Sequence, residues 1–247
     1  MKTILITGAS RGIGAATALL AARRGYAVCV NYRHDETAAQ NVASDIKSLG
    51  GTVITVAADI AIEADVIRLF NTCQQQLGHI DALVNNAGIL EKQMRLEQMD
   101  VGRMQRIIST NVIGSLLCAR EAVKRMSTKH GGRGGAIVNL SSAAARLGAP
   151  NEYIDYAASK GAIDSLTIGL AKEVAEEGIR VNAVRPGLIH TDMHASGGEP
   201  DRIDRLEASV PMKRGGTAQE VAEAIMWLLS DESSYVTGNI IDVTGGR

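Results

Sequence analysis

Tyr156 and Lys160 carry the clearest chemical signal in the sequence. They stand four positions apart in Tyr156-Ala157-Ala158-Ser159-Lys160, within a helical pattern. Residues i and i+4 share one face of a helix, so the Lys160 ammonium is expected near the Tyr156 hydroxyl. A neighbouring positive charge favours phenolate and lowers the pKa of a tyrosine, which is ordinarily about 10. The pair therefore predicts a general acid/base, and two solvated residues on a helix surface are the structural alternative.

A pair of serines precedes this segment. Asn139-Leu140-Ser141-Ser142 closes a predicted strand, and ligands of open α/β sheets bind at the carboxyl ends of the strands. Ser142 is therefore expected to hydrogen-bond a substrate oxygen, and Ser141 is the alternative serine.

A glycine-rich turn lies at the other end of the predicted site. Thr7-Gly8-Ala9-Ser10-Arg11-Gly12-Ile13-Gly14 follows the first predicted strand and opens the first predicted helix. Gly8, Gly12 and Gly14 allow backbone N–H groups to approach a pyrophosphate, and the helix N-terminus adds partial positive charge. The turn predicts a dinucleotide site, although its spacing differs from the commoner G-x-G-x-x-G.

The second predicted strand ends without the acidic residue that usually holds the ribose hydroxyls of NAD. Asn31-Tyr32-Arg33 stands there, and the first acidic residue is Asp35. Arg33, with Arg11 in the glycine turn, is placed to meet a 2′-phosphate. This favours NADP(H) over NAD(H), and the alternative is that both arginines are merely solvated.

The order and spacing of these motifs resemble the short-chain dehydrogenase/reductase family over nearly the whole chain. The matching features are Thr7-Gly8-x-x-x-Gly12-x-Gly14, Asp59, Asn85-Asn86-Ala87-Gly88, Asn111, Ser142, Tyr156-x-x-x-Lys160 and Pro186-Gly187. The pattern is similar to the 3-oxoacyl carrier-protein reductase and glucose dehydrogenase branches. The resemblance implies an NADP(H)-dependent oxidoreductase that acts on a small carbonyl or alcohol substrate, with NAD(H) as the alternative cofactor. A non-catalytic NADP(H)-binding sensor is the alternative function.

The resemblance implies four catalytic residues. Tyr156 would exchange a proton with the substrate oxygen, and Ser142 would hydrogen-bond that oxygen. Lys160 would lower the Tyr156 pKa and hold the nicotinamide ribose. Asn111 would hold a water that links Lys160 to bulk solvent.

The resemblance also implies a set of cofactor contacts. Asp59 would contact the adenine ring, Asn85-Asn86-Ala87-Gly88 would line the cofactor, and Thr191 would bind the nicotinamide carboxamide. The expected cofactor-binding residues are Gly8, Ser10, Arg11, Gly12, Ile13, Gly14, Asn31, Arg33, Asp59, Ile60, Asn86, Ala87, Gly88, Tyr156, Lys160, Pro186, Gly187, Ile189 and Thr191.

The sequence departs from the family pattern between Ser142 and Tyr156. These residues are fourteen positions apart, where many family members have one residue fewer. The extra residue is expected in the loop Leu147–Asp155, beside the active site.

The elements that position these residues alternate between short β-branched runs and longer helical patterns. Strands are predicted at Thr3–Thr7, Ala27–Asn31, Thr52–Ala57, Ala82–Asn85, Ala136–Leu140, Arg180–Val184 and Asn239–Val243, and helices near 12–24, 35–49, 62–77, 100–128, 154–177 and 217–230. Most strands are apolar on both faces, as in a sheet covered on both sides. The alternation predicts a single α/β domain over 1–247, with a Rossmann-like, doubly wound, seven-stranded parallel sheet and helices on both faces.

Composition excludes several classes of protein. The net charge of −1 gives no reason to expect nucleic acid or an anionic membrane as a partner. The longest run without charged residues, Ile107–Ala119, is too short for a membrane-spanning helix. The three cysteines are odd in number and far apart, which is typical of reduced thiols in a cytoplasmic protein.

Several further segments lead to expectations about partners and ligands. His190, Asp192 and His194 lack an evident further ligand, so no metal site is expected. The stretch 188–212 is expected to form a substrate loop. Arg95, Arg103 and Arg106 would make a basic patch for a carrier protein conceivable, and a hydroxyl-bearing small molecule is equally compatible. Gly131–Gly135 precedes a strand, which favours a mobile connection over a phosphate loop. The family resemblance further implies a homotetramer.

Overall fold

The chain folds around a parallel sheet of seven strands, as the alternation predicts. The computed structural model describes residues 1–191 and 193–247. The sheet has the order β3-β2-β1-β4-β5-β6-β9, and every pairing is parallel. Its strands are β1 (Thr3–Ile6), β2 (Ala27–Tyr32), β3 (Val53–Ala57), β4 (Ala82–Asn85), β5 (Gly135–Leu140), β6 (Ile179–Pro186) and β9 (Ile240–Val243).

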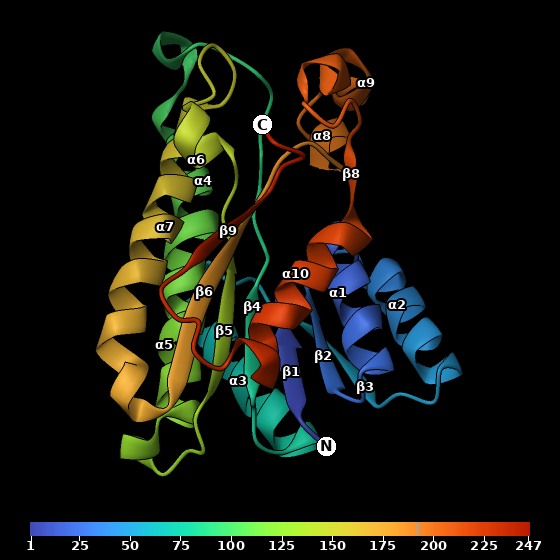
Figure 1. Cartoon of the computed structure of the whole chain (residues 1–247), viewed down its shortest axis with the longest axis vertical. Helices are drawn as coiled ribbons and strands as arrows, with labels where there is room; N and C mark the ends of the chain where they lie inside the picture. Colours follow the sequence, from blue (N-terminus) through green and yellow to red (C-terminus); the bar gives the residue numbers. More distant parts are fainter. Residues whose placement is uncertain (192) are drawn as a thin grey trace.

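Helices cover both faces of this sheet (Figure 1). The helices are α1 (Gly12–Arg23), α2 (Glu36–Ser48), α3 (Glu63–Leu77), α4 (Val101–Ile108), α5 (Ser115–Met126), α6 (Ala144–Leu147), α7 (Ile154–Val174), α8 (Met193–Ser196), α9 (Arg202–Leu206) and α10 (Ala218–Leu229). Short 3₁₀ turns lie at Leu96–Gln98, Thr128–His130, Ala175–Glu177, Glu207–Ser209 and Asp231–Ser233. No helix in the described part of the chain is long and apolar enough to cross a membrane.

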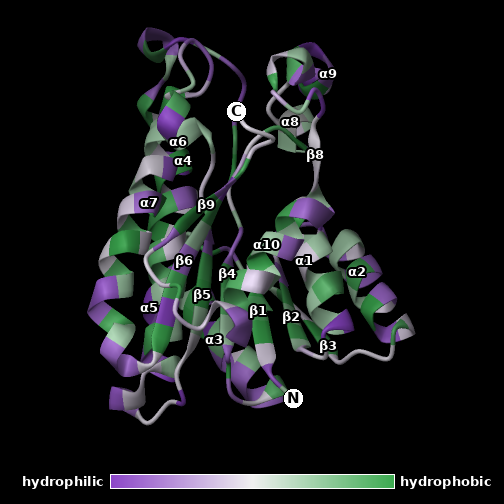
Figure 2. Ribbon diagram, viewed as in Figure 1, coloured by the Kyte–Doolittle hydropathy of each residue, from purple (hydrophilic) through white to green (hydrophobic). Residues whose placement is uncertain are grey.

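The two faces of the sheet bury two separate apolar cores. Along β1, Ile4 and Ile6 pack on the side of α1, α2 and α10, whereas Leu5 packs on the side of α3, α5 and α7. This alternation follows from the period of two in a strand. Figure 2 shows hydrophobic colour concentrated on the strands and on the sheet-facing sides of the helices. Strands buried on both sides explain the near-continuous apolar runs of the sequence.

The strand order reverses between β1 and β4. From β1 the chain moves outward through β2 and β3, and it then returns to β4 and moves the other way. In such sheets the crevice at the carboxyl ends of the two central strands is the usual ligand site. The glycine-rich turn after β1 and the segment after β4 both open into this crevice.

A wide turn interrupts the long helix that was predicted near 100–128. Residues Ser109–Gly114 form a π-helical turn between α4 and α5. Such turns are rare and are often found at functional sites. A Cβ on Gly114 would lie 2.7 Å from Cδ1 of Ile60, so the turn packs closely against the segment after β3.

The glycine segment before β5 is closely packed at Gly132, Gly134 and Gly135, whereas Gly131 has open space around it. Gly134 has φ +80°, and a Cβ there would lie 2.4 Å from the carbonyl oxygen of Gly178. Its N–H donates to the carbonyl of Met126 at 2.8 Å. The glycines are needed because two turns approach each other closely.

The segment that follows β6 forms a small separate lobe. Strand β7 (Ile189–His190) pairs in parallel with β8 (Gly216–Thr217). Between them lie α8 and α9, and α9 contributes Ile203 to a small apolar cluster with Leu188 and Val210. In Figure 1 this lobe stands above the carboxyl ends of the central strands. The expected substrate loop therefore has regular structure of its own.

Candidate active site

The glycine-rich turn is locked to the end of β4 by two polar side chains. The hydroxyl of Thr7 accepts the N–H groups of Asn86 and Ala87, each at 3.0 Å. The amide of Asn86 donates to the carbonyls of Thr7 and Gly8 at 2.8 and 2.9 Å. A Cβ on Gly14 would lie 2.5 Å from that amide nitrogen, so the turn has no room for a side chain there. Thr7 is absent from the predicted cofactor set, although it begins the motif.

Asn31 supports this turn from behind. It is buried, and its carbonyl oxygen accepts the N–H of Gly8 at 3.1 Å. Its amide nitrogen donates to the carbonyls of Tyr32, Val56 and Ala58. The side chain thus joins β2, β3 and the turn, and its hydrogen-bonding capacity is used by backbone rather than directed at a ligand.

Arg33 and Asp59 contact each other at the adenosine end. Their Nε and Oδ2 atoms are 2.9 Å apart, and the side chains are 51% and 17% exposed. The other oxygen of Asp59 accepts the N–H of Ala61 at 3.0 Å. The Arg33 guanidinium is therefore held at the end of β2 while it remains open to solvent. Asp35 caps α2 by accepting the N–H of Ala38, so its carboxylate serves that helix.

Ser142 and Tyr156 meet in a cavity of about 430 Å³ at the carboxyl end of the sheet. Residues from both predicted ends of the site line it, including Ile13, Asn86, Ser142, Tyr156, Lys160, Pro186, Gly187, Ile189 and Thr191. Ser142 is the serine whose hydroxyl hydrogen-bonds with Tyr156. Ser141 instead donates to Asp164 at 2.6 Å and to the carbonyl of Lys160 at 3.2 Å. The geometry therefore favours Ser142 over Ser141 as a ligand of the substrate oxygen.

The expected lowering of the Tyr156 pKa does not occur in the chain alone. Burial raises the pKa of Tyr156 to about 12, and the hydrogen bond with Ser142 only partly offsets this. Burial also lowers the pKa of Lys160 to about 8, although Asp164 opposes the change. The Lys160 ammonium donates to the carbonyl of Leu140 at 2.6 Å and lies 5.5 Å from the centre of the Tyr156 ring. Desolvation, which disfavours both charged forms, outweighs the attraction that the i, i+4 spacing predicted.

Asn111 lies in the π-helical turn and is fully buried. Its amide nitrogen donates to the carbonyl of Ile89 at 3.1 Å and to the hydroxyl of Ser159 at 3.0 Å. Its oxygen accepts the N–H of Ile89 at 2.8 Å. A Cβ on Gly88 would contact both Asn111 and the Lys160 nitrogen, at 3.4 and 3.5 Å. The wide turn thus brings Asn111 close to Lys160 behind the cavity.

A buried ion pair that local sequence patterns do not predict lies next to Tyr156. Arg103 contacts Asp155 through two hydrogen bonds, of 2.7 and 3.2 Å, and donates to the carbonyl of Lys92 at 2.5 Å. The two side chains are only 2% and 4% exposed. Asp155 also accepts the N–H of Tyr156 at 2.8 Å. The pair therefore fixes the start of α7, which carries the predicted acid/base.

The suggested basic patch for a carrier protein is not formed. Arg103 is buried, Arg95 pairs with Glu97, and Arg106 pairs with Glu91. The spacing of the arginines was visible in the sequence, but their partners were not.

The remaining predicted contacts differ in how they face the cavity. The methyl carbon of Thr191 lies 3.4 Å from the place of a Cβ on Gly12, so the lobe reaches the glycine turn. Ile60 is buried against Gly114, and Ser10 and Arg11 stand on the outer side of the turn. Arg11 contacts the hydroxyl of Ser196 at 3.4 Å. Asp192, part of the histidine segment considered for a metal, lies outside the described residues, and the others contain no cluster of three metal-ligating side chains.

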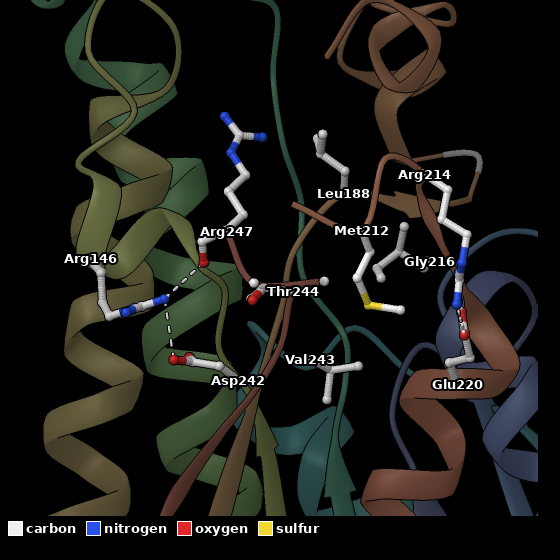
Figure 3. A pocket seen from close by; sticks show the side chains of 13 residues that line it. Arg146, Leu188, Met212, Arg214, Gly216, Glu220, Asp242, Val243, Thr244 and Arg247 are labelled. Atoms are coloured by element: carbon white, nitrogen blue, oxygen red, sulfur yellow. Dashed lines mark hydrogen bonds and ion pairs between the residues drawn. The ribbon is translucent and has the colours of Figure 1, made fainter. Parts of the chain in front are cut away.

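A second hollow of about 610 Å³ adjoins the cavity on the side of the C-terminal segment. Figure 3 shows Arg146 directed at Asp242 and Arg214 directed at Glu220. Arg146 also donates to the carbonyl oxygen of Arg247 at 3.1 Å.

The residues around the crevice fit a dinucleotide. The glycine turn exposes backbone at the N-terminus of α1, where an anion is favoured. The Arg33 guanidinium stands at the far end of the crevice, and Thr191, Tyr156 and Lys160 stand at the near end.

Comparison with known proteins agrees with this arrangement. The family described as Enoyl-(Acyl carrier protein) reductase matches residues 8–247. The chain is 58% identical to "Uncharacterized oxidoreductase YgfF" of Escherichia coli strain K12, over 100% of both chains. It is 37% identical to 3-oxoacyl-(acyl-carrier-protein) reductase of Staphylococcus epidermidis, over 99% of this chain and 98% of the relative.

Solved structures give the same result. A short-chain type dehydrogenase/reductase from Mycobacterium marinum superposes with a TM-score of 0.93 and 36% identity, covering 99% of this chain and 94% of that one. Sequence, sheet topology and cavity agree, and the chain belongs to the short-chain dehydrogenase/reductase family.

Proposed function

We propose that this oxidoreductase uses NADP(H) and that Tyr156 is the general acid/base for a carbonyl or alcohol substrate. One observation carries the proposal: Ser142 and Tyr156 meet at the cavity, with Lys160 buried directly behind them. A bound nicotinamide dinucleotide supplies the group that accepts or donates hydride. Every other task falls to side chains of the chain.

During reduction, negative charge develops on the carbonyl oxygen. The hydroxyls of Ser142 and Tyr156 would both donate to that oxygen, which stabilises the developing charge before the chemical step begins. Tyr156 then gives its proton to the oxygen, and it takes the proton back during oxidation. Burial keeps Tyr156 protonated at neutral pH, as a proton donor requires.

Lys160 supports the reverse direction. Its ammonium, positioned by the carbonyl of Leu140, stabilises the phenolate when Tyr156 has released its proton. Asn111, next to Lys160, is the group proposed to hold a water on the path to solvent. The π-helical turn supports this proposal, because Asn111 on this turn lies close to Lys160 behind the cavity.

The preference for NADP(H) rests on the end of β2. No acidic side chain faces the ribose position from that strand end, since Asp35 caps α2. Arg33, held by Asp59 and half exposed, is available for a 2′-phosphate. A phosphate recognised by a guanidinium forms charge-assisted hydrogen bonds.

The proposal is tested by Tyr156→Phe, which removes only the hydroxyl. Reduction of a panel of ketones, aldehydes, sugars and 3-oxoacyl thioesters is followed by NADPH absorbance, and NADPH binding by fluorescence. Turnover should fall by at least about 10²–10³-fold, the usual cost of losing one such donor, while NADPH affinity stays the same. Near-normal turnover by Tyr156→Phe would overturn the assignment. Tight NADPH binding by the wild type with no turnover of any compound would favour the non-catalytic sensor.

We also propose a homotetramer. Large apolar side chains are exposed on helices that could face other copies, namely Ile113 and Leu116 around the start of α5 and Ile168 on α7. Light scattering that gives the mass of one chain would contradict this.

A further inference from the structure

One wall of the catalytic cavity is closed by a polar cluster whose members bind one another. Arg202 on α9 pairs with Glu152 at 2.5 Å and stacks over the Tyr153 ring, 5.2 Å from its centre. The amide oxygen of Gln93, in its hydrogen-bonded orientation, accepts from Arg202 at 2.8 Å and from the Tyr153 hydroxyl at 3.3 Å. Its nitrogen donates to Glu199 at 3.2 Å. The cluster joins the lobe to the loop Leu147–Asp155, where the extra residue of this chain is expected.

Because these side chains bind one another, few of their hydrogen-bonding groups are left for a substrate. Arg202, Glu152 and Tyr153 all line the cavity, but each already has a charged or hydrogen-bonded partner. The Arg202 and Glu152 side chains are 9% and 26% exposed, so the pair is largely removed from water. A substrate hydroxyl placed against them would have to displace an existing contact.

The loop itself is built to present this wall. Ala149 and Asn151 adopt positive φ angles of 46° and 63°, which are uncommon for residues other than glycine. Between them and α7, Glu152 donates its N–H to the carbonyl of Ala149, and its own carbonyl accepts the N–H of Met94. The tightly turned loop directs Glu152 and Tyr153 to the cavity.

An apolar surface makes up most of the rest of the wall beyond the catalytic hydroxyls. Its members are Leu90, Ala143, Ala144, Leu147, Ala149, Pro150, Leu188 and Met193. The remaining polar side chains of the wall are those of Asn86, Ser141, Thr191 and Arg247. Three of them already have partners: Asn86 donates to the carbonyls of Thr7 and Gly8, Ser141 donates to Asp164, and Thr191 donates to the carbonyl of Ile189.

Charged groups nearby are turned to the second hollow instead. In Figure 3, Arg146 and Arg214 point to Asp242 and Glu220, and neither arginine lines the catalytic cavity. Arg247 borders both spaces and is partly exposed, so water can solvate its guanidinium. The described residues that line the cavity contain no cluster of unpaired cations for an anionic substrate.

We infer that the substrate is a compact ketone or secondary alcohol with an apolar body, rather than a sugar or a carrier-protein thioester. The inference rests on the proposed function. In the reduction, hydride passes from NADPH to the carbonyl carbon, the oxygen takes the Tyr156 proton, and NADP⁺ and a secondary alcohol are formed. A hydroxyl on the body of the substrate would lose its water without gaining a partner, which is unfavourable.

The test uses two ketones of nearly equal shape, 4-methylcyclohexanone and 4-hydroxycyclohexanone. Wild-type kcat/KM with NADPH should be about 10- to 100-fold higher for the methyl compound, the range expected for a hydroxyl that enters an apolar site unpaired. Glucose and an acetoacetyl thioester are assayed in parallel.

A pair of variants links the preference to the polar cluster. Arg202→Leu frees the Glu152 carboxylate to accept a hydroxyl, so the ratio should fall at least about fivefold. The double variant Arg202→Leu with Glu152→Leu should restore it, because the wall is apolar again. The ratio cancels a general loss of activity caused by a looser lobe. Arg24→Leu is the control and should leave the ratio unchanged, because Arg24 forms an exposed pair with Glu223 and neither residue lines the cavity.

The possible outcomes distinguish the inferred substrate class from the proposed function. A ratio near one in the wild type, or better turnover of glucose or the thioester, overturns the substrate class while the proposed function stands. An unchanged ratio in Arg202→Leu overturns the role of the cluster. Failure to turn over any of these compounds, despite NADPH binding, contradicts the proposed function itself.

Discussion

Replacing Arg103 by methionine should destabilise the protein far more than the loss of any surface ion pair. Methionine keeps most of the volume but removes the guanidinium from Asp155 and from the carbonyl of Lys92. The Asp155 carboxylate then stays buried without its partner, since its side chain is only 4% exposed. Breaking a buried pair in this way costs about 3–5 kcal/mol.

Two further variants isolate the cause. Asp155→Asn keeps an oxygen for the Tyr156 N–H but removes the negative charge. Added to Arg103→Met, it should recover at least about 1 kcal/mol, because a neutral pair carries no uncompensated charge. Lys2→Met is the control, since Lys2 and Asp231 are 52% and 91% exposed, and it should change stability by less than about 1 kcal/mol.

The assay is urea unfolding at constant pH and protein concentration, together with kinetics. Because Asp155 binds the backbone of Tyr156, kcat should fall for Arg103→Met while NADPH affinity is retained. The reasoning is refuted if Arg103→Met unfolds within about 1 kcal/mol of the wild type, or if Asp155→Asn worsens it further.

Three other predictions follow from the site. Between pH 8 and 10, the free energy of unfolding of the wild type should rise by about 2–3 kcal/mol relative to that of Lys160→Met. The reason is that Lys160 loses its proton near pH 8 in the folded chain but only near about pH 10.5 in the unfolded chain. Urea unfolding across this pH range checks the sign of the change. Ser142→Ala should reduce kcat about 10²-fold or more with little change in NADPH binding. Ser141→Ala should mainly lower the melting temperature, because the Ser141 hydroxyl binds Asp164. A larger loss of kcat in Ser141→Ala than in Ser142→Ala would exchange the roles of the two serines. Arg33→Ala should raise the Kd of NADPH at least about tenfold and leave that of NADH within twofold, as measured by fluorescence titration; equal losses would remove the argument for the 2′-phosphate.

The sheet could be predicted from the sequence because its strands carry a strong local signal. Ile4, Leu5 and Ile6 are buried on alternating faces, and runs of this kind are apolar throughout. The crevice then follows from the strand order and the position of the glycine turn. The family resemblance added the expected roles of Asn111 and Thr191, which local patterns do not suggest.

The sequence does not reveal which distant residues pair with each other, nor how burial changes the pKa values of the site residues. Arg103 and Asp155 are 52 positions apart, so nothing local distinguishes Arg103 from the exposed Arg106 on the same helix. The Tyr156–Lys160 spacing was informative about proximity. The direction of the pKa changes, however, depends on desolvation, which the spacing does not contain.

The wide turn Ser109–Gly114 constrains how this part of the gene can change over generations. A further codon inserted there, without a second wide turn to absorb it, would turn the following helix by about 100° relative to the preceding one. Either Arg103 and Ile107 on α4 or Cys118 and Ala122 on α5 would then leave the interior, where all four are buried. Substitutions on the outer surface of this turn leave the relation of the two helices unchanged, whereas such an insertion does not. The number of residues in this segment therefore matters as much as their identity.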